Sequence, residues 1–246
     1  MTDHLATRLT DFDAVLFDLD GVITPTADVH MRAWQTMFDE LFAAWQISPP
    51  YTDADYYAYV DGKKRYDGVA ALLRSRNVEL AWGHPDDPPE HDSVCGVGNR
   101  KNGAFLAVLD KEGIAPYPGS IALVDALESA GVPVAIVSSS KNARPVLEAA
   151  GIIDRFPVIV DGVTAETHHL PSKPAPDVFL EGARELGTDP ARTVVVEDAI
   201  AGVESGVAGG FGLVIGVDRG AGADALRAAG AHLIVNDLSE LLEGSE

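Results

Sequence analysis

The segment that most constrains this chain is 15–22, where a short apolar run leads directly into Asp-Leu-Asp-Gly. An apolar run of this kind predicts a buried parallel strand, and an open α/β sheet binds its ligands at the carboxyl ends of its strands. We therefore expect Asp18 and Asp20 to face one crevice from a strand tip, with Gly21 allowing a sharp turn. Two carboxylates at the rim of a core are costly unless a ligand uses them, although an acidic surface turn fits the same residues.

The rest of the chain predicts an α/β fold, a doubly wound parallel sheet with an inserted helical domain. From residue 120 onward, short apolar runs alternate with helical periodicity, which is typical of a parallel sheet covered by helices. Residues 29–115 show no clear strand and predict a helical cap, so the core would comprise 1–28 and 116–246. Within the cap, residues 82–98 are rich in proline, glycine and acids and predict a long loop, either a functional lid or a flexible insert. We expect strands at 13–17, 132–137, 158–160, 193–196, 213–217 and 233–235.

Composition narrows the class of protein. The chain has 246 residues, 46% of them hydrophobic, which is enough for one large core with an inserted lobe. Its net charge of −20 disfavours nucleic-acid and anionic-membrane partners, since these bind basic surfaces. The lone Cys95 excludes an internal disulfide and has no neighbouring sequence signal for a nucleophile. Residues 1–13 hold no apolar signal region, and no apolar run approaches the ~18 residues of a membrane span, so we expect a cytoplasmic monomer.

The later predicted strands also end in polar residues. Residues 138–142 read Ser-Ser-Ser-Lys-Asn before a helix, where hydroxyl and backbone N–H groups form an anion cradle or, alternatively, Ser140 caps the helix. Lys173 lies in a loop stiffened by two prolines and could equally be a solvated lysine. Glu197 and Asp198 end the fourth strand, where an aspartate also serves as an ordinary helix cap. Because parallel strands end at one edge, these side chains and the Asp18–Asp20 pair should meet.

Acids gathered at one edge need a cation, and oxygen-only ligands favour Mg²⁺ together with phosphate oxygens. Ser138 and Lys173 would then bind phosphate, at a site without a P-loop, because the sequence has no GxxxxGK[ST]. Asp18, ionised near neutrality, would attack phosphorus and form an aspartyl-phosphate. Asp20, crowded by other carboxylates, would have a raised pKa and act as general acid and base. The expected metal ligands are Asp18, Asp20, Glu197 and Asp198.

These four segments resemble the motifs of the haloacid dehalogenase superfamily, in that family's order and spacing. The second aspartate, Asp20, is similar to the phosphatase and phosphomutase branches, whereas dehalogenases lack an acid there. The β-phosphoglucomutase family is the nearest match, through residues 20–24, 30–34, 138–142 and 172–179. Two cap segments, 62–65 and 100–102, resemble that family's substrate loops. The resemblance implies phosphate binding by Ser138, Ser139 and Lys173, and substrate binding by His30, Gly62, Arg65, Lys101, Ser140 and Asn142.

The resemblance also implies specific roles for three cap residues. Arg65 would bind the distal phosphate, Lys101 would lie near the sugar, and His30 would couple cap closure to Asp20. The same residues also fit plainer roles, as a partly buried helix histidine and two solvated charges. A bisphosphorylated sugar on a chain of charge −20 nevertheless needs basic groups at both ends of its site. Pro25 and the long 82–98 loop depart from the family pattern.

Three functions follow from these residues. The first is a Mg²⁺-dependent phosphomutase that converts β-glucose 1-phosphate to glucose 6-phosphate through an aspartyl-phosphate and glucose 1,6-bisphosphate. The alternative is a sugar-phosphate phosphatase with the same core and a cap that admits water. The third, a non-catalytic sugar-phosphate sensor, is disfavoured because a sensor has no need of both Asp18 and Asp20.

Overall fold

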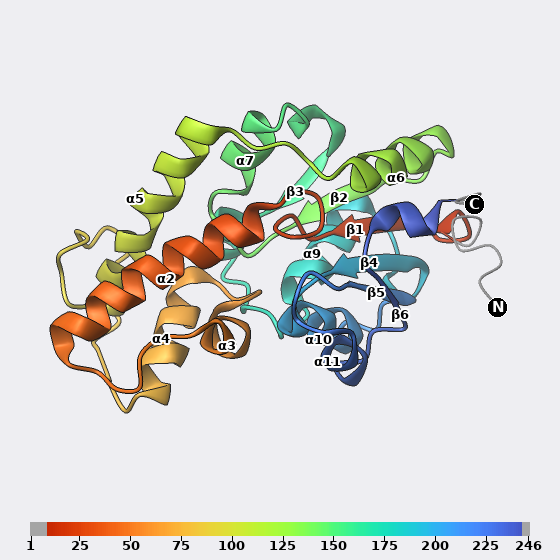
Figure 1. Cartoon of the computed structure of the whole chain (residues 1–246). Helices are drawn as coiled ribbons and strands as arrows, with labels where there is room; N and C mark the ends of the chain where they lie inside the picture. Colours follow the sequence, from red (N-terminus) through yellow and green to blue (C-terminus); the bar gives the residue numbers. More distant parts are fainter. Residues whose placement is uncertain (1–8, 243–246) are drawn as a thin grey trace.

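In this computed structural model, which describes residues 9–242, six parallel strands form one sheet in the order β3-β2-β1-β4-β5-β6 (Figure 1). The chain runs outward from β1 through β2 to β3 and then returns to the other side of β1, so strand order reverses between β1 and β4. Ligands of open α/β sheets bind at such a reversal. The predicted doubly wound sheet is confirmed. Its strands are β1 Ala14–Phe17, β2 Val134–Val137, β3 Val158–Val160, β4 Thr193–Glu197, β5 Leu213–Val217 and β6 Leu233–Val235.

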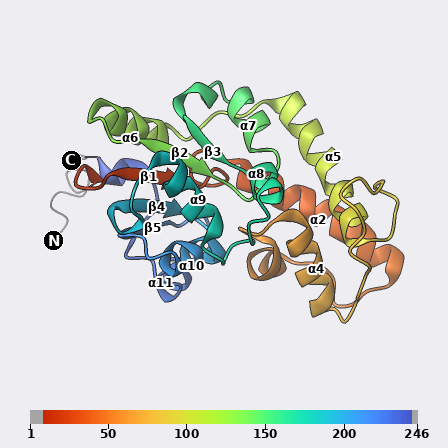
Figure 2. The ribbon, with the colours of Figure 1, turned by 180° about the vertical axis from the view of Figure 1, so that it is seen from behind.

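Helices cover both faces of the sheet (Figure 2). Alternation along β1 sends Val15 and Phe17 into one apolar cluster and Leu16 into another, and all three side chains are fully buried. Helices α6 and α7 and the short helix η4 pack on the first cluster, and α8 to α11 pack on the second. The helices of this part are α6 Pro118–Ser129, α7 Ala143–Ala149, η2 Ile153–Arg155, α8 Gly162–Thr167, α9 Asp177–Leu186, η3 Pro190–Arg192, α10 Ile200–Ala208, α11 Ala223–Ala228 and η4 Leu238–Leu241.

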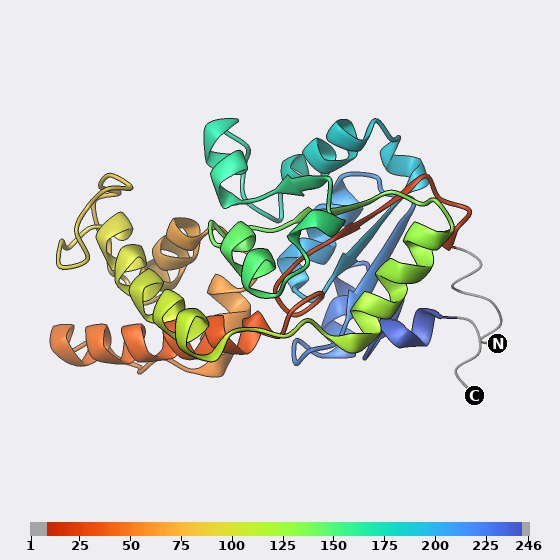
Figure 3. The same ribbon diagram turned by 90° about the horizontal axis from the view of Figure 1, so that it is seen from above.

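A helical lobe lies beyond the carboxyl ends of the strands (Figure 3). It has its own apolar cluster, in which Trp34 and Phe38 stack at 5.4 Å between ring centroids. Phe105 and Leu109, from the last lobe helix, pack instead on the first sheet cluster, the one that contains Val15 and Phe17. The lobe therefore contacts the core through apolar packing as well as through its connecting segments. The boundaries 29–115 stay a prediction. The lobe elements are α2 Thr26–Trp45, α3 Asp53–Asp55, the π-helix η1 Tyr56–Val60, α4 Arg65–Ser75 and α5 Val94–Glu112.

The lobe differs from the sequence prediction at two places. The loop predicted over residues 82–98 is shorter than expected, because helix α5 already begins at Val94. Ser93 caps this helix by accepting a hydrogen bond from Gly96 N at 3.0 Å, and a Cβ on Gly96 would lie 2.2 Å from the carbonyl oxygen of His91. Gly96 is therefore needed for close packing within a helix, although its type suggested a loop. The short helices α3 and η1, in residues 53–60, were not predicted at all.

Candidate active site

Asp18, Lys173 and Glu197 form a buried cluster at the tips of β1 and β4. The backbone continues the sheet to this point, since Asp18 N donates to Val196 O at 2.9 Å. Lys173 Nζ donates to Asp18 Oδ1 at 2.8 Å, to Glu197 Oε1 at 2.7 Å and to Val137 O at 3.2 Å, with the lysine 1% exposed. Burial alone lowers the pKa of Lys173, but the two carboxylates outweigh it and the net pKa is raised. Lys173 is thus a fixed ammonium beneath Asp18 and not a solvated lysine.

Asp20 lies where the chain leaves the sheet for the lobe. Gly21 follows it with φ +88°, a left-handed conformation that glycine adopts without strain. Asp20 N donates to Asp18 Oδ2 at 2.9 Å, while the Thr26 hydroxyl donates to Asp20 Oδ1. Burial raises the pKa of Asp20 to about 6, and the neighbouring Asp18 carboxylate acts in the same direction. A carboxyl with this pKa can hold or release a proton near neutral pH, as general acid–base work requires.

The turn after β2 presents three serine hydroxyls at the sheet edge. Ser138 Oγ lies 3.5 Å from Asp20 Oδ2 and accepts a hydrogen bond from Ser140 N at 3.0 Å. Ser140 Oγ in turn accepts from Asn142 N at 3.1 Å, which shapes the turn, while Asn142 is the residue at the N-cap of α7. Ser139 Oγ points across to the lobe and donates to Gly62 O at 2.8 Å. The turn therefore joins the sheet edge to the lobe.

The lobe supplies two cationic side chains. Arg65 NH2 donates to Asn102 Oδ1 at 2.7 Å, and Asn142 Nδ2 donates to the same oxygen at 2.8 Å, so one amide links lobe and core. Lys101, 2% exposed, lies with Nζ 4.7 Å from the ring centroid of Phe105. Burial, together with the charge of Arg65, lowers the pKa of Lys101 to about 7 against the opposing effect of Asp20. Both cations are held in place and are not free surface charges.

His30 connects Lys101 to Asp20. Its Nδ1 contacts Lys101 Nζ, and its Nε2 lies 3.5 Å from Asp20 Oδ1. Burial lowers the pKa of His30 well below its usual range, and the charges of Lys101 and Arg65 add to this, so the ring is neutral. In the tautomer in which Nδ1 accepts from Lys101, Nε2 carries the ring proton and faces the Asp20 carboxylate without a hydrogen bond to it.

One cavity between core and lobe brings nearly all the predicted residues together. Two are not on its wall: Lys173 lies behind Asp18, and Asn142 donates to Asn102, whose oxygen also accepts from Arg65 of the wall. The predicted residues on the wall are Asp18, Asp20, His30, Gly62, Arg65, Lys101, Ser138, Ser139, Ser140, Glu197 and Asp198.

Besides Lys63 of the 62–65 segment, two charged residues on the wall were not predicted as site residues. Burial raises the pKa of Asp61 to about 7, with Glu197 acting in the same direction. Lys141 lies 5.2 Å from the ring centroid of Tyr66 and is paired with Glu166 at 2.7 Å. Both are sequence neighbours of predicted site residues, Asp61 beside Gly62 and Lys141 between Ser140 and Asn142, and this adjacency was the available signal.

Comparison with known proteins agrees with this geometry. The family model described as "Hydrolase: haloacid dehalogenase-like hydrolase" matches residues 12–210. The chain belongs to the haloacid dehalogenase-like hydrolase family. Its members are enzymes, and this chain is accordingly an enzyme that transfers phosphoryl groups, not a sensor. None of the helices described within residues 9–242 is long and apolar enough to cross a membrane.

Relatives within the haloacid dehalogenase-like family include both mutases and phosphatases. A β-phosphoglucomutase of Mycobacterium bovis is 46% identical over 239 residues, covering 93% of this chain and 91% of the relative. Hexitol phosphatase A of Escherichia coli is 33% identical over 226 residues, covering 92% and 91%. The crystal structure of β-phosphoglucomutase from Clostridium difficile superposes with a TM-score of 0.76 at 25% identity, covering 94% of each chain. These similarities support phosphomutase or phosphatase activity.

Phosphomutases and phosphatases of the haloacid dehalogenase-like family generally use a divalent metal ion, and the acids here fit one. Glu197 is already engaged, since Oε1 accepts from Lys173 and Oε2 from Ala199 N. Asp198 has no hydrogen-bond donor among residues 9–242, and burial together with Asp61 raises its pKa well above normal. Within the same residues, no three acid, histidine or cysteine side chains are arranged to hold a metal by themselves. A small cation bound by Asp18 and Asp198, with water and phosphate oxygens as further ligands, would relieve this repulsion.

Proposed function

We propose that this enzyme is a Mg²⁺-dependent phosphomutase that interconverts β-glucose 1-phosphate and glucose 6-phosphate. The observation that carries the proposal is the cavity wall, which brings Asp18, paired behind the wall with Lys173, together with Arg65 and Lys101 from the lobe. A sugar with two phosphates fits such a site, because each phosphate meets fixed cationic or hydrogen-bonding groups. The similarity to β-phosphoglucomutases along 93% of the chain supports the same substrate class.

The chemistry divides between the two aspartates. An Asp18 carboxylate oxygen would attack phosphorus, so that a new O–P bond forms as the bond to the sugar oxygen breaks. Asp20 would give its proton to that leaving oxygen, and later take the proton of the hydroxyl that attacks the aspartyl-phosphate. Ser138 would hold the transferring phosphoryl group at the sheet edge, and the Lys173 ammonium, behind Asp18, would offset its negative charge. Asp18 and Asp198 would hold the Mg²⁺, which would supply charge neutralisation for the phosphate.

Closure of the lobe favours transfer to sugar over transfer to water. Polar contacts that tie lobe to core include Ser139 Oγ to Gly62 O at 2.8 Å, Lys64 N to Ser172 Oγ at 2.9 Å, and Asn142 Nδ2 to Asn102 Oδ1 at 2.8 Å. A closed cavity excludes the water that would hydrolyse the aspartyl-phosphate. His30 lies between Lys101 and Asp20, so lobe closure would bring it against the general acid–base Asp20.

The phosphatase alternative rests on the 33% identity to hexitol phosphatase A. A phosphatase needs the same core residues, and its cap must admit water after the first transfer. We also propose that the enzyme is a cytoplasmic monomer, with domain boundaries at 28/29 and 115/116. These proposals hold for either of the two reactions.

Arg65→Ala should separate sugar-phosphate chemistry from the core chemistry. We expect kcat/KM for β-glucose 1-phosphate to fall roughly 30- to 100-fold, since a charge-assisted hydrogen bond contributes about 2–3 kcal/mol. Hydrolysis of a small aryl phosphate, which has no second phosphate, should change much less. The matched control is Arg32→Ala, an exposed arginine of α2, which should alter neither reaction. Equal losses on both substrates would make Arg65 a structural residue.

A further inference from the structure

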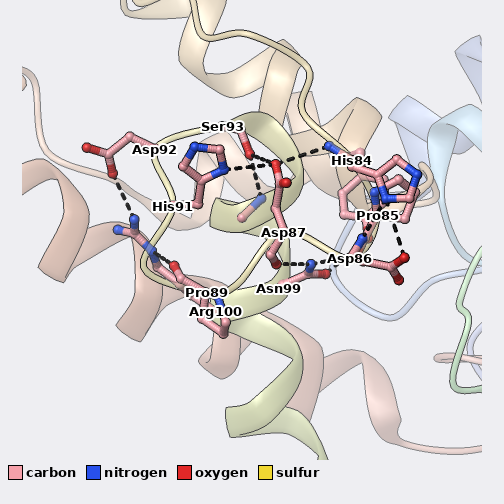
Figure 4. Close-up of polar contacts among 12 residues, drawn as sticks. His84, Pro85, Asp86, Asp87, Pro89, His91, Asp92, Ser93, Asn99 and Arg100 are labelled. Carbon is pink, nitrogen blue, oxygen red and sulfur yellow. Dashed lines mark hydrogen bonds and ion pairs between the residues drawn. The ribbon is translucent and has the colours of Figure 1, made fainter.

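The loop preceding α5, residues 84–93, is organised around one carboxylate (Figure 4). Asp87 Oδ2 accepts from Ser93 Oγ at 2.5 Å and from His84 N at 3.1 Å, and His91 Nδ1 lies 3.2 Å away. These hydrogen bonds, with that of Ser93 the strongest, lower the pKa of Asp87, so the carboxylate stays ionised. Arg100 adds a contact at the loop's other end through Asp92, at 2.9 Å. The predicted lid is therefore a compact, internally bonded loop.

Asn99 connects this loop to the site. Its Nδ2 donates to the carbonyl oxygens of Pro85 and Asp87, each at 2.9 Å (Figure 4). Its Oδ1 faces the other way and accepts from Tyr66 Oη at 3.0 Å and from Arg65 NH1 at 3.4 Å. One amide thus uses its donors on the loop and its acceptor on Arg65, so the loop fixes the direction in which Asn99 presents its oxygen.

Arg65 is oriented by neutral groups. Its two terminal nitrogens donate to amide oxygens, NH1 to Asn99 and NH2 to Asn102. No carboxylate of residues 9–242 forms an ion pair with Arg65. An amide oxygen fixes a guanidinium as a carboxylate would, but it leaves the positive charge uncancelled. In a chain of net charge −20, a half-buried arginine of the cavity wall that faces amide oxygens and no carboxylate keeps its positive charge available to an anion.

We propose that Asn99 is a positioning residue for anion binding, which holds Arg65 toward the cavity while sparing its charge, and that the 84–93 loop supports it. The inference rests on the proposed function, in that Arg65 is the group that binds the distal phosphate. The ligand recognised this way is a second phosphate dianion on a sugar whose first phosphate lies at Asp18. Asparagine at position 99 then gives a higher affinity for bisphosphorylated substrates than aspartate would.

The test is the isosteric change Asn99→Asp, read by inhibition with glucose 1,6-bisphosphate of aryl phosphate hydrolysis. A carboxylate at this position would pair with Arg65 and compete with the phosphate, so we expect the inhibition constant to rise at least tenfold. Asn99→Ala, which removes the hydrogen bonds without adding charge, should raise it only about threefold. Asp86→Asn, an exposed loop acid whose side chain is 91% accessible, should leave the constant unchanged.

Two comparisons decide the result. Asp87→Asn weakens the loop without changing the charge beside Arg65, and should raise the inhibition constant less than Asn99→Asp does. If Asp87→Asn matches Asn99→Asp, or if Asn99→Asp stays within twofold of wild type, the proposed role of Asn99 is wrong. Failure of the wild-type enzyme to form glucose 6-phosphate would instead contradict the proposed mutase, and it leaves this inhibition test readable because aryl phosphate hydrolysis does not require mutase activity.

Discussion

Asp18→Asn should abolish turnover of every phosphorylated substrate, by about 10⁴-fold or more. The amide has no anionic oxygen to attack phosphorus, while its shape and its contact with Lys173 Nζ, at 2.8 Å in the wild type, are kept. The loss should be the same for β-glucose 1-phosphate and for a small aryl phosphate, because both react at the same oxygen. Steady-state rates on the two substrates, with circular dichroism to check folding, measure it.

The control for Asp18→Asn is an acid that is not on the wall of the catalytic cavity. Asp28→Asn changes an acid in the first turn of α2 and should keep wild-type rates. Retention of more than a hundredth of wild-type activity by a folded Asp18→Asn enzyme would contradict covalent catalysis at Asp18. Activity lost on the sugar phosphate alone would equally contradict it, since it would place Asp18 in substrate recognition.

Lys173→Met should cost both activity and stability. The ammonium is 1% exposed and bonds two carboxylates, Asp18 and Glu197, which would be left buried without a counter-charge. Breaking a buried ion pair by removing one partner costs about 3–5 kcal/mol of unfolding free energy. We expect a loss of this size in urea denaturation at pH 7.5, with turnover at the limit of detection.

The pH dependence of that loss has a definite sign. Burial already raises the pKa of Glu197 to about 7 in the wild type, although Lys173 pulls it down, and removal of the lysine raises it further. An acid with a raised folded-state pKa stabilises the fold at low pH and loses that contribution as pH rises through the folded pKa. The deficit of Lys173→Met should therefore be larger at pH 8 than at pH 6. A constant deficit, or one that shrinks with rising pH, would show that packing and not charge holds Lys173. The control is Lys63→Met, a half-buried lysine that forms no ion pair with Asp18 or Glu197.

The sheet and its catalytic edge could be predicted from sequence, because both depend on short apolar runs and on the polar residues that end them. The run ending in Asp18 is apolar on both faces, and β1 is indeed hydrogen-bonded on both sides, to β2 and β4. Parallel strands end at one edge by construction, so Asp18, Ser138 and Glu197 had to meet. The assignment of Lys173 to that edge followed in the same way.

The lobe was less predictable because its contacts are non-local. Asn102 accepts from Arg65 and from Asn142, 37 and 40 positions away in sequence, and no local pattern encodes such a meeting. The 84–93 loop is ordered by the single carboxylate Asp87, and composition alone suggested flexibility. Asp61 was missed because its adjacency to Gly62 was the only sequence signal, while its interactions with Glu197 and Asp198 form only in the folded chain.

The measurement that tests the central claim most directly is a product assay with Mg²⁺, β-glucose 1-phosphate and a trace of glucose 1,6-bisphosphate. Glucose 6-phosphate and free phosphate would be followed together in one reaction. The proposed mutase predicts rapid glucose 6-phosphate formation with at most a few per cent as much free phosphate, because the closed lobe excludes water. Free phosphate released without glucose 6-phosphate would contradict it and identify the enzyme as a phosphatase.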